Sequence, residues 1–341
     1  MIFVAALVAF ALAGLLTPVL ARWAHRRNFL DIPNYRSSHV IATPRIGGIA
    51  LVTSVVVSLG LLQVAGAGVG RDAAVVLAGA LAIAGLGLAD DFWTLPAVAR
   101  LVVQSVVAAT VVGMVGPFAL GWFAPDSRVA MALTVVWIVL LTNGYNFMDG
   151  IDGIAASQAL VAGIGWTIVA LLAGSPDIAA LSLLIAGASG GFLLHNWQPA
   201  KVFMGDAGSG FVGFLLAALP LLAPTGRVSF VWCGVLLMWP FVFDTGFTVL
   251  RRVSRFENIL SAHRSHIYQR LVIAGCSHRD VTLVYAGLAL LGVLSAILVE
   301  THQPMAPLVS ILTIAIAAAA LWWSTSSRES ASDRSSRRAA I

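Results

Sequence analysis

The stretch on which the fold and the function both depend is Asn143-Gly144-Tyr145-Asn146-Phe147-Met148-Asp149-Gly150-Ile151-Asp152-Gly153, directly after the run 129–141, which is apolar apart from Thr134. Two amides and two carboxylates stand at three-residue intervals in it, so they can line one side of a turn or of a fraying helix end. Carboxylates beside an apolar segment are costly unless something pairs with them. With Gly150 and Gly153 allowing close backbone approach, the pattern favours a hard-metal or phosphate site over an ordinary polar loop.

The composition indicates that most of the chain lies in a lipid bilayer. The chain is 59% hydrophobic and 10% charged, with a mean hydropathy of +0.93. Soluble domains carry about a quarter charged residues, so the sequence predicts an integral membrane protein. Cys233 and Cys276 are the two cysteines and are expected to be free thiols, because two cysteines make no disulfide framework.

Apolar segments of about 20 residues can each span a membrane as a helix. Eleven such segments predict an all-α polytopic membrane protein: 1–21, 46–65, 72–89, 97–115, 129–142, 154–174, 178–195, 207–223, 228–250, 283–299 and 305–323. We expect one transmembrane domain over 1–323 and a disordered basic tail over 324–341.

The charges indicate how the chain is oriented. The connectors alternate between a short, plain set (66–71, 116–128, 175–177, 224–227 and 300–304) and a long, charged set (22–45, 90–96, 143–153, 196–206 and 251–282). Arg71, Arg128 and Arg227 belong to the first set. The other seventeen of the twenty Lys and Arg residues fall with the second set, counting Arg100 one turn into the span that follows it, or in the tail. The positive-inside rule makes the second set cytoplasmic, which puts the N-terminus in the periplasm and the C-terminus in the cytoplasm. The basic pI therefore describes topology, and no nucleic-acid partner is expected.

Every dense polar motif lies in the second set of connectors: 36–48, 90–91, 143–153, 196–210 and 263–269. Although distant in sequence, they would share one membrane face. A solute pathway would place polar groups at mid-bilayer depth. The pattern thus predicts an active-site cleft on the cytoplasmic face.

Asp90-Asp91 ends an apolar run, with Arg100 one turn into the next helix. Adjacent carboxylates repel, and a helix C-terminus is unfavourable for negative charge. The pair is either a topological stop with Arg100 as partner or, as we favour, a base and a metal contact.

The segment 196–210 leads directly into a predicted helix and ends in Gly205-Asp206-Ala207-Gly208-Ser209-Gly210. Small residues at a helix start expose N–H groups to an anion. Asp206 would oppose a phosphate there unless a divalent cation bridges the two. Lys201 is the single lysine of the chain, and Phe203 is either an interfacial aromatic or a residue that stacks on a nucleobase.

Two basic segments complete the set. His263-Arg264-Ser265-His266-Ile267-Tyr268-Gln269 is denser in cations than the positive-inside rule requires and would suit a diphosphate, and Arg36, His39 and Arg45 precede Gly47-Gly48 with the same ambiguity. Asp244, inside a predicted span, is expected either to pair with an arginine or to line the cavity.

Together these motifs resemble the polyprenyl-phosphate N-acetylhexosamine-1-phosphate transferase family, glycosyltransferase family 4, which includes the peptidoglycan phospho-MurNAc-pentapeptide translocase. The similarity extends from Arg36 to Arg270 and rests on Thr43-Pro44-Arg45-Ile46-Gly47-Gly48, Asp90-Asp91, 143–153, 203–209 and the histidine segment. Eleven spans with a cytoplasmic tail resemble the O-antigen-initiating branch.

The resemblance implies a reaction in the bacterial inner membrane. Undecaprenyl phosphate attacks the sugar-bearing phosphorus of a UDP-N-acetylhexosamine, giving lipid diphosphate sugar and UMP with Mg²⁺, or Mn²⁺ in its place. The family is a phosphotransferase that initiates cell-envelope polysaccharide such as O-antigen. The resemblance leaves a homodimer open.

The resemblance also implies roles for individual residues. Asn146 and Asp206 match the metal ligands, and the expected catalytic residues are Asp90, Asp91, Asp149 and His266. The expected substrate-binding residues are Arg36, His39, Arg45, Asp152, Asn196, Lys201, Phe203, His263 and Arg264. Asp152 and Asn196 match the nucleoside side and Phe203 the uracil-stacking aromatic. Tyr268 and Gln269 stand where the family has further histidines, as in the branch that uses modified deoxy-N-acetylhexosamines.

Two other classes compete with this interpretation. An intramembrane prenyltransferase would need a third carboxylate, which Asp90-Asp91-Phe92-Trp93-Thr94 lacks, and would leave 205–210 unused. A transporter of an anionic lipid or sugar would release no UMP.

Overall fold

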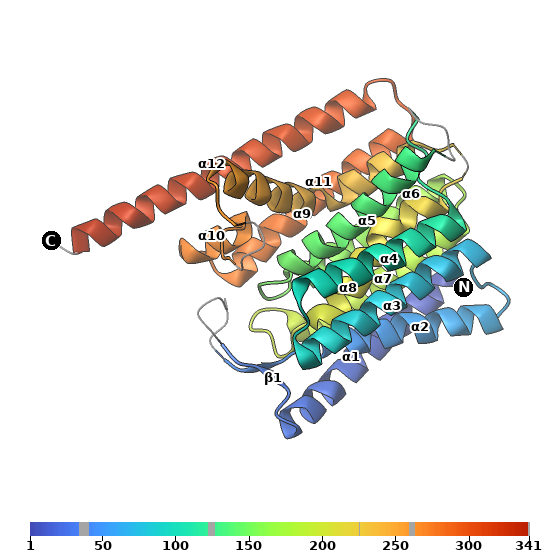
Figure 1. Ribbon diagram of the computed structural model, residues 1–341, viewed down its shortest axis with the longest axis horizontal. Coiled ribbons are helices and arrows are strands. Elements are labelled where there is room, and N and C mark those ends of the chain that lie inside the picture. The colour runs from blue at the N-terminus through green and yellow to red at the C-terminus, as the bar shows by residue number, and fades with distance from the viewer. Residues whose placement is uncertain (34–40, 122–126, 225, 259–262, 340–341) are drawn as a thin grey trace.

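Long helices lie side by side in a bundle, and the two ends of the chain lie at opposite ends of it (Figure 1). The structure is a computed structural model that describes residues 1–33, 41–121, 127–224, 226–258 and 263–339. Within these residues eleven helices are long and apolar enough to cross a membrane. The prediction of an all-α, multi-pass membrane protein with eleven spans is therefore confirmed.

The helices follow the predicted spans closely. They are α1 (Ile2–Arg26), α2 (Gly47–Val64), α3 (Arg71–Trp93), α4 (Ala97–Val115), α5 (Arg128–Met148), α6 (Ile154–Leu172), α7 (Pro176–Asn196), α8 (Gly205–Ala218) with the 3-10 turn η1 (Leu219–Leu222), α9 (Ser229–Ser254), α10 (Ile267–Ile273), α11 (His278–Glu300) and α12 (Ala306–Ala339). The sequence did not predict α10 or the two-residue strands β1 (Leu30–Asp31) and β2 (Thr43–Pro44), which pair antiparallel.

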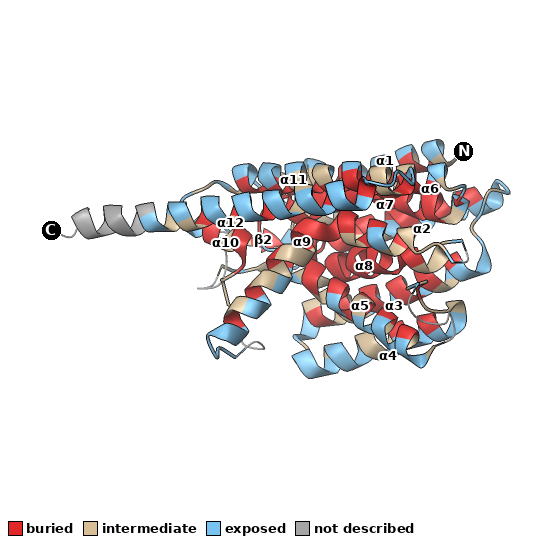
Figure 2. Cartoon of the chain, turned by 90° about the horizontal axis from the view of Figure 1, so that it is seen from above, coloured by how far each residue is buried: buried red, intermediate tan, exposed pale blue. Residues whose placement is uncertain are grey.

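The core of the bundle is α8. Every residue of this helix except Asp206 is buried, whereas α1, α4 and α12 present large exposed apolar side chains on the outside (Figure 2). A helix that is hydrophobic all round belongs either in the centre of a protein or against lipid. Asp206, the one residue of α8 that is not buried, therefore lies at the end of the central helix.

Glycines let two other helices reach that point. A Cβ on Gly48 would lie 2.3 Å from the nitrogen of Gly208, and a Cβ on Gly87 would lie 2.2 Å from the carbonyl oxygen of Asp206. Real Cβ atoms do not come so close, so α2 and α3 contact α8 backbone to backbone because these positions lack a side chain. Arg45, just before α2, and Asp90 and Asp91, in the last turn of α3, therefore lie close to Asp206.

Two motifs assigned to connectors lie inside helices instead. Helix α3 continues through Asp90 and Asp91 to Trp93, and ends where Thr94 takes a left-handed conformation (φ 49°) two residues before Pro96. Helix α5 continues to Met148, so Asn143 and Asn146 lie in its last turns. Their hydrogen-bonding side chains therefore have helical spacing, and they point from rigid elements.

The end of α12 also differs from expectation. The helix was expected to end near residue 323, yet it has 34 residues and runs to Ala339. At 1.5 Å per residue this is about 51 Å, well beyond a hydrocarbon core of about 30 Å. The helix therefore continues into the predicted tail, past Glu329, whose side chain is tied to α10.

Candidate active site

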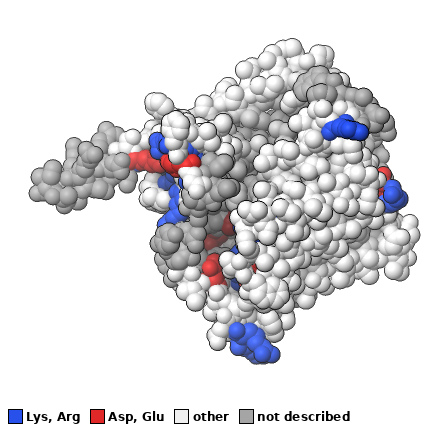
Figure 3. Space-filling model, viewed as in Figure 1, with Lys and Arg blue, Asp and Glu red and all other residues white. Residues whose placement is uncertain are grey.

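The carboxylate of Asp206 is the centre of a charged cluster at the end of the bundle that carries α10. Its Oδ1 accepts a hydrogen bond from Arg45 Nη2 at 2.6 Å and from Asn146 Nδ2 at 3.1 Å, and its Oδ2 lies 3.4 Å from Arg100 Nη1. Four elements, the β2–α2 connection, α4, α5 and α8, therefore meet at one carboxylate. Figure 3 shows the acidic and basic atoms recessed at this end, whereas most of the flank in view is uncharged.

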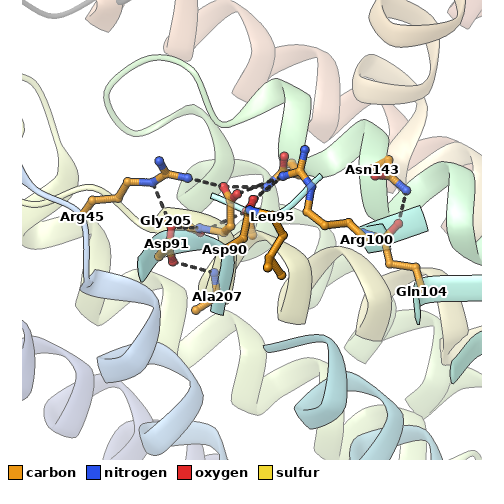
Figure 4. Close-up of polar contacts among 12 residues, drawn as sticks. Arg45, Asp90, Asp91, Leu95, Arg100, Gln104, Asn143, Gly205 and Ala207 are labelled. Atoms are coloured by element: carbon orange, nitrogen blue, oxygen red, sulfur yellow. Dashed lines mark hydrogen bonds and ion pairs between the residues drawn. The ribbon is translucent and has the colours of Figure 1, made fainter. Parts of the chain in front are cut away.

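Asp91 holds the start of α8 in place. Its Oδ1 accepts from the backbone nitrogen of Asp206 at 3.0 Å and its Oδ2 from that of Ala207 at 3.1 Å, while Arg45 Nε lies 3.0 Å from Oδ1 (Figure 4). A carboxylate on free N–H groups at a helix N-terminus is favoured both as a cap and by the helix dipole. Asp91 thus acts as an N-cap supplied by another helix, and it aims Asp206.

Both carboxylate oxygens of Asp90 also have partners within the protein. Its Oδ1 accepts from the backbone nitrogen of Leu95 at 2.6 Å, and its Oδ2 pairs with Arg100 Nη1 (Figure 4). Arg100 therefore bridges Asp90 and Asp206. The ion pair with Arg100 that was expected for this carboxylate pair is present. Asp90 and Asp91 also lie in the same cluster as Asp206, where the alternative of a base and a metal contact would require them.

Asn143, Asn146, Asp149 and Asp152 form a ladder of polar side chains along the 143–153 stretch, and its two amides have different partners. Asn146 Nδ2 donates to Ser209 Oγ at 2.8 Å as well as to Asp206, so it lies in the cluster. Asn143 Nδ2 donates instead to Gln104 Oε1 of α4 at 2.6 Å, one turn deeper than Arg100 (Figure 4). The spacing therefore brings one amide to the acidic centre and the other to the α4–α5 contact.

Asp149 follows the last residue of α5 and has no hydrogen-bond partner for its carboxylate among the described residues. Burial, and then the nearby Asp206 carboxylate, raise the pKa of Asp149 to about 7. Burial would lower the pKa of Arg45, but the carboxylates of Asp206 and Asp91 outweigh it and raise that pKa above its usual value. The cluster thus combines a permanently charged guanidinium with a carboxylate that titrates near neutral pH.

The histidine segment packs against the same region through Asp244 of α9. Asp244 is fully buried and accepts from the backbone nitrogens of Ile267 and Tyr268 at 2.8 and 3.1 Å and from Tyr285 Oη at 2.5 Å, and it lies 3.2 Å from His266 Nδ1. It was expected to pair with an arginine or to line a cavity. That expectation is wrong, because the carboxylate caps α10 and orients the His266 ring.

Tyr268 links this segment to the ladder. Its hydroxyl donates to the carbonyl oxygen of Phe147 at 3.0 Å, and a Cβ on Gly150 would collide with that hydroxyl. Burial raises the pKa of Tyr268, so the hydroxyl remains a donor. The ring centroid of His266 is 6.3 Å from that of Phe147, which brings His266 beside the end of α5.

The remaining predicted residues lie around this centre. His263 Nδ1 lies 2.9 Å from Ser265 Oγ and its ring is 5.1 Å from that of His266. Burial, and then His266, lower the pKa of His263 to about 4, so it is neutral at neutral pH. Arg264 is half-buried on the same segment, and Arg36 and His39 lie outside the described residues.

Asp152 and Asn196 form a second polar group. Asp152 Oδ2 accepts from the backbone nitrogen of Ala200 at 3.1 Å and Oδ1 lies 3.2 Å from His278 Nδ1. Asn196 accepts from the backbone nitrogen of Gly153 at 3.1 Å and donates to the carbonyl oxygen of Val202 at 2.9 Å. Both side chains tie the ladder to the 196–202 loop, and neither contacts Asp206.

That loop ends in Phe203, which the backbone fastens to the Arg45 segment. Its nitrogen donates to the carbonyl oxygen of Pro44 at 2.8 Å, and its own carbonyl oxygen accepts from Gly47 at 2.9 Å. The bridge between Arg45 and Phe203 places Phe203 beside the cluster, where it is half-buried. Lys201, two residues earlier, is exposed.

Comparisons with known proteins agree with this geometry. Residues 73–223 match the family described as glycosyl transferase family 4. The chain is 32% identical over 314 residues to the probable undecaprenyl-phosphate N-acetylglucosaminyl 1-phosphate transferase of Bacillus subtilis, covering 88% of this chain and 85% of that protein.

This chain belongs to glycosyl transferase family 4.

Two further family 4 relatives differ in how much of the chain they match. The decaprenyl-phosphate N-acetylglucosaminephosphotransferase of Mycobacterium tuberculosis is 30% identical over 332 residues, covering 86% of this chain and 81% of its own. The phospho-N-acetylmuramoyl-pentapeptide-transferase of Levilactobacillus brevis is 32% identical over 181 residues, covering 52% and 51%. The family resemblance is thus confirmed, and the first two match over nearly the whole chain.

Sequence reasoning about this family 4 chain missed part of the cluster. Arg100 was considered only as a neutralising partner of Asp90, and Ser209 was not singled out, yet both contact the Asp206 group. The Arg-x-x-x-Gln spacing of Arg100 and Gln104 inside a predicted span was the available signal, because an arginine there needs a partner.

The donor set of the family 4 cluster fits a hard divalent cation. Carboxylate oxygens of Asp206, with the amide oxygen of Asn146 after a turn of its side chain, are the ligands that Mg²⁺ prefers. Among the described residues no group of three His, Cys, Asp or Glu could hold a metal by itself. Mg²⁺ is usually held by one or two carboxylates together with water and substrate phosphates, which agrees with this sparse set.

Proposed function

We propose that this protein transfers N-acetylhexosamine 1-phosphate from a UDP-sugar to undecaprenyl phosphate in the bacterial inner membrane, releasing UMP and starting a cell-envelope glycan. One observation carries the proposal: two arginines and three aspartates, Asp206 among them, meet from four elements at one end of a membrane bundle. A water-soluble diphosphate and a lipid phosphate can meet only at such a membrane face.

The arginines have a direct use in this reaction. Arg45 and Arg100 each contact Asp206 and one further aspartate. Phosphate oxygens can replace carboxylate oxygens in the same geometry, since guanidinium groups bind both. A diphosphate entering with a cation on Asp206 would therefore find two cations already aimed at it.

A bound Mg²⁺ or Mn²⁺ would be held by Asp206 and Asn146 and would neutralise charge on the diphosphate. Phosphoryl transfer needs positioning and charge neutralisation more than covalent chemistry from the protein. Asp91 contributes by fixing the start of α8 through the amides of Asp206 and Ala207.

Asp149 suits the role of proton acceptor. The resemblance implied that Asp90 or Asp91 orients or deprotonates the lipid phosphate, but their oxygens accept hydrogen bonds from the backbone nitrogens of Leu95, Asp206 and Ala207. The Asp149 carboxylate, with a pKa of about 7, is better suited to take the proton. An oxygen of the lipid phosphate then forms a bond to the sugar-bearing phosphorus, whose bond to the UMP oxygen breaks.

His266 is proposed to touch the same substrates from the side of α10. The Asp244 carboxylate accepts a hydrogen bond from Nδ1–H of His266, which leaves Nε2 to face the substrates. Nε2 donates to a phosphate oxygen when the ring carries both protons. Arg264 and His263 on this segment and Lys201 on the 196–202 loop are proposed to bind the diphosphate, and the same role is proposed for Arg36 and His39. Phe203 is proposed to stack on the uracil, with Asp152 and Asn196 holding the loop that presents it.

The names of the two relatives that match nearly the whole chain make N-acetylglucosamine the first sugar to test. Tyr268 and Gln269, in place of histidines, favour instead the branch that uses modified deoxy-N-acetylhexosamines. A panel of UDP-N-acetyl sugars decides between them, because turnover with one donor only would assign the branch.

The reaction class is tested with purified protein in nanodiscs, UDP-N-acetylglucosamine or another UDP-N-acetyl sugar, undecaprenyl phosphate and Mg²⁺. The expected products are UMP and a lipid carrying two phosphates, identified by mass spectrometry. Release of UDP would mean transfer of the sugar without its phosphate. Release of inorganic diphosphate from a prenyl donor would favour a prenyltransferase, and uptake into vesicles without UMP would favour a transporter.

A further inference from the structure

The short helix α10 carries the histidine segment but cannot be stable alone. It has seven residues, and isolated helices shorter than about 12 residues are marginal in water. Its position is therefore set by the contacts it makes with other helices. Two of them have been described: Asp244 at its N-terminus and the Tyr268 hydroxyl on the carbonyl of Phe147.

A third contact comes from α12. Arg270 Nε donates to Glu329 Oε1 at 2.6 Å and Nη2 donates to Oε2 at 2.5 Å, a two-pronged pair of the strongest kind. The guanidinium carbon also lies 4.9 Å from the centre of the Trp322 ring, within the range of a cation–π interaction. Trp322 in turn packs on Phe247 of α9, with ring centroids 4.6 Å apart.

Burial makes this contact important. The Arg270 side chain is 6% exposed, and within the described chain Glu329 is the carboxylate that it contacts. A buried guanidinium left without its carboxylate carries an uncompensated charge and must move toward water. Because Arg270 is four residues from His266, such a movement would shift His266 as well.

We propose that Glu329, Arg270 and Trp322 form a clamp through which α12 positions His266 for catalysis. The role assigned to His266 rests on the proposed function. None of the three clamp residues touches the Asp206 cluster in the described structure, so they are positioning residues. The clamp explains why α12 extends beyond the apolar segment: Glu329 lies about two turns past Trp322, at the level of α10 (Figure 1).

The test compares Glu329→Gln with Arg328→Gln in nanodiscs. Arg328 is the exposed neighbour on α12, so the control removes one charge from the same helix turn. In Glu329→Gln we expect faster amide hydrogen exchange over 267–273 and an approximately 10- to 100-fold lower kcat with little change in KM, since a displacement of about 1 Å can cost 10²-fold. Arg328→Gln should match the wild type in both measurements.

A double-mutant cycle with His266→Ala separates positioning from general destabilisation. If the clamp acts through His266, Glu329→Gln should cost little further turnover in the His266→Ala background, because groups acting as a unit are not additive. Additive losses, or unchanged exchange over 267–273 in Glu329→Gln, would overturn the proposal. A wild-type protein that releases no UMP would instead refute the proposed function, and the exchange comparison would still decide whether α12 holds α10.

Discussion

Replacing Asp206 with asparagine is the most direct test of the site. The substitution keeps the shape of the side chain and removes the charge that Arg45, Arg100 and Asn146 surround. The cation proposed to bind there would lose its carboxylate ligand. We expect UMP release to fall by about 10³-fold or more, which corresponds to about 4 kcal/mol of transition-state stabilisation.

The same substitution should affect folding far less. Orphaning a buried charge costs about 3–5 kcal/mol, but Arg45 keeps Asp91 at 3.0 Å and Arg100 keeps Asp90. What is lost is the charge in two arginine contacts, at 2.6 and 3.4 Å, on a carboxylate that is 18% exposed. We expect about 1–2 kcal/mol of destabilisation, which lowers the Tm by several degrees in a chain of this size.

Turnover is measured by UMP release in nanodiscs and stability by thermal unfolding of the same preparation. Asp177→Asn is the control, because the Asp177 carboxylate, like that of Asp206, accepts a hydrogen bond within the protein, here from the backbone nitrogen of Gly70 at 3.1 Å, and lies away from the site. Asp206→Glu keeps the charge and moves it by one methylene, so it should fold and still lose turnover. Near-normal turnover of Asp206→Asn with an unchanged Mg²⁺ requirement would refute the assignment.

Three further outcomes follow from the geometry. Because the pKa of Asp149 is raised to about 7, the carboxylate gains its proton as the pH falls, so kcat/KM should drop about tenfold per unit below pH 7. The negative charge of Asp206 helps to raise the pKa of Asp149, so Mg²⁺ bound to Asp206 should move this acidic fall in kcat/KM to lower pH. If the fall persists in Asp149→Asn, Asp149 is excluded as the base. Asp91→Asn should cost about 1 kcal/mol of stability as a lost helix cap and also reduce kcat, and a folded variant with wild-type kcat would contradict its role in aiming Asp206. Tyr268→Phe should cost about 1 kcal/mol in thermal unfolding through the lost bond to Phe147, and an unchanged Tm would mean that this bond contributes nothing.

The eleven spans were readable from the sequence because a membrane helix needs a long apolar run and little else. The three-residue spacing also predicted that Asn146 lies on the polar side of its helix, where it contacts Asp206. The same rule was less informative for Asn143 and Asp152, which pair with Gln104 and with the 196–202 loop. A regular spacing names the face on which side chains lie but not the neighbour that faces them.

The structure of the histidine segment could not be predicted from the sequence. The seven residues of α10 are too few for a periodic signal, and the helix exists because Asp244, Phe147 and Glu329 bind it from three other helices. The partners of Asp244 could not be assigned from the sequence, because a carboxylate inside a predicted span indicates that partners are needed but not which residues supply them.

By itself the sequence determined the solvent, the number of spans and the residue types gathered at one membrane face, since these depend on composition and on order along the chain. The tertiary structure decided which charges meet. Arg45 and Asp206 are 161 residues apart, and they touch because Gly48, Gly87 and Gly208 let three helix backbones pack without side chains between them. Such a contact is a property of surfaces in three dimensions, and local pattern cannot encode it.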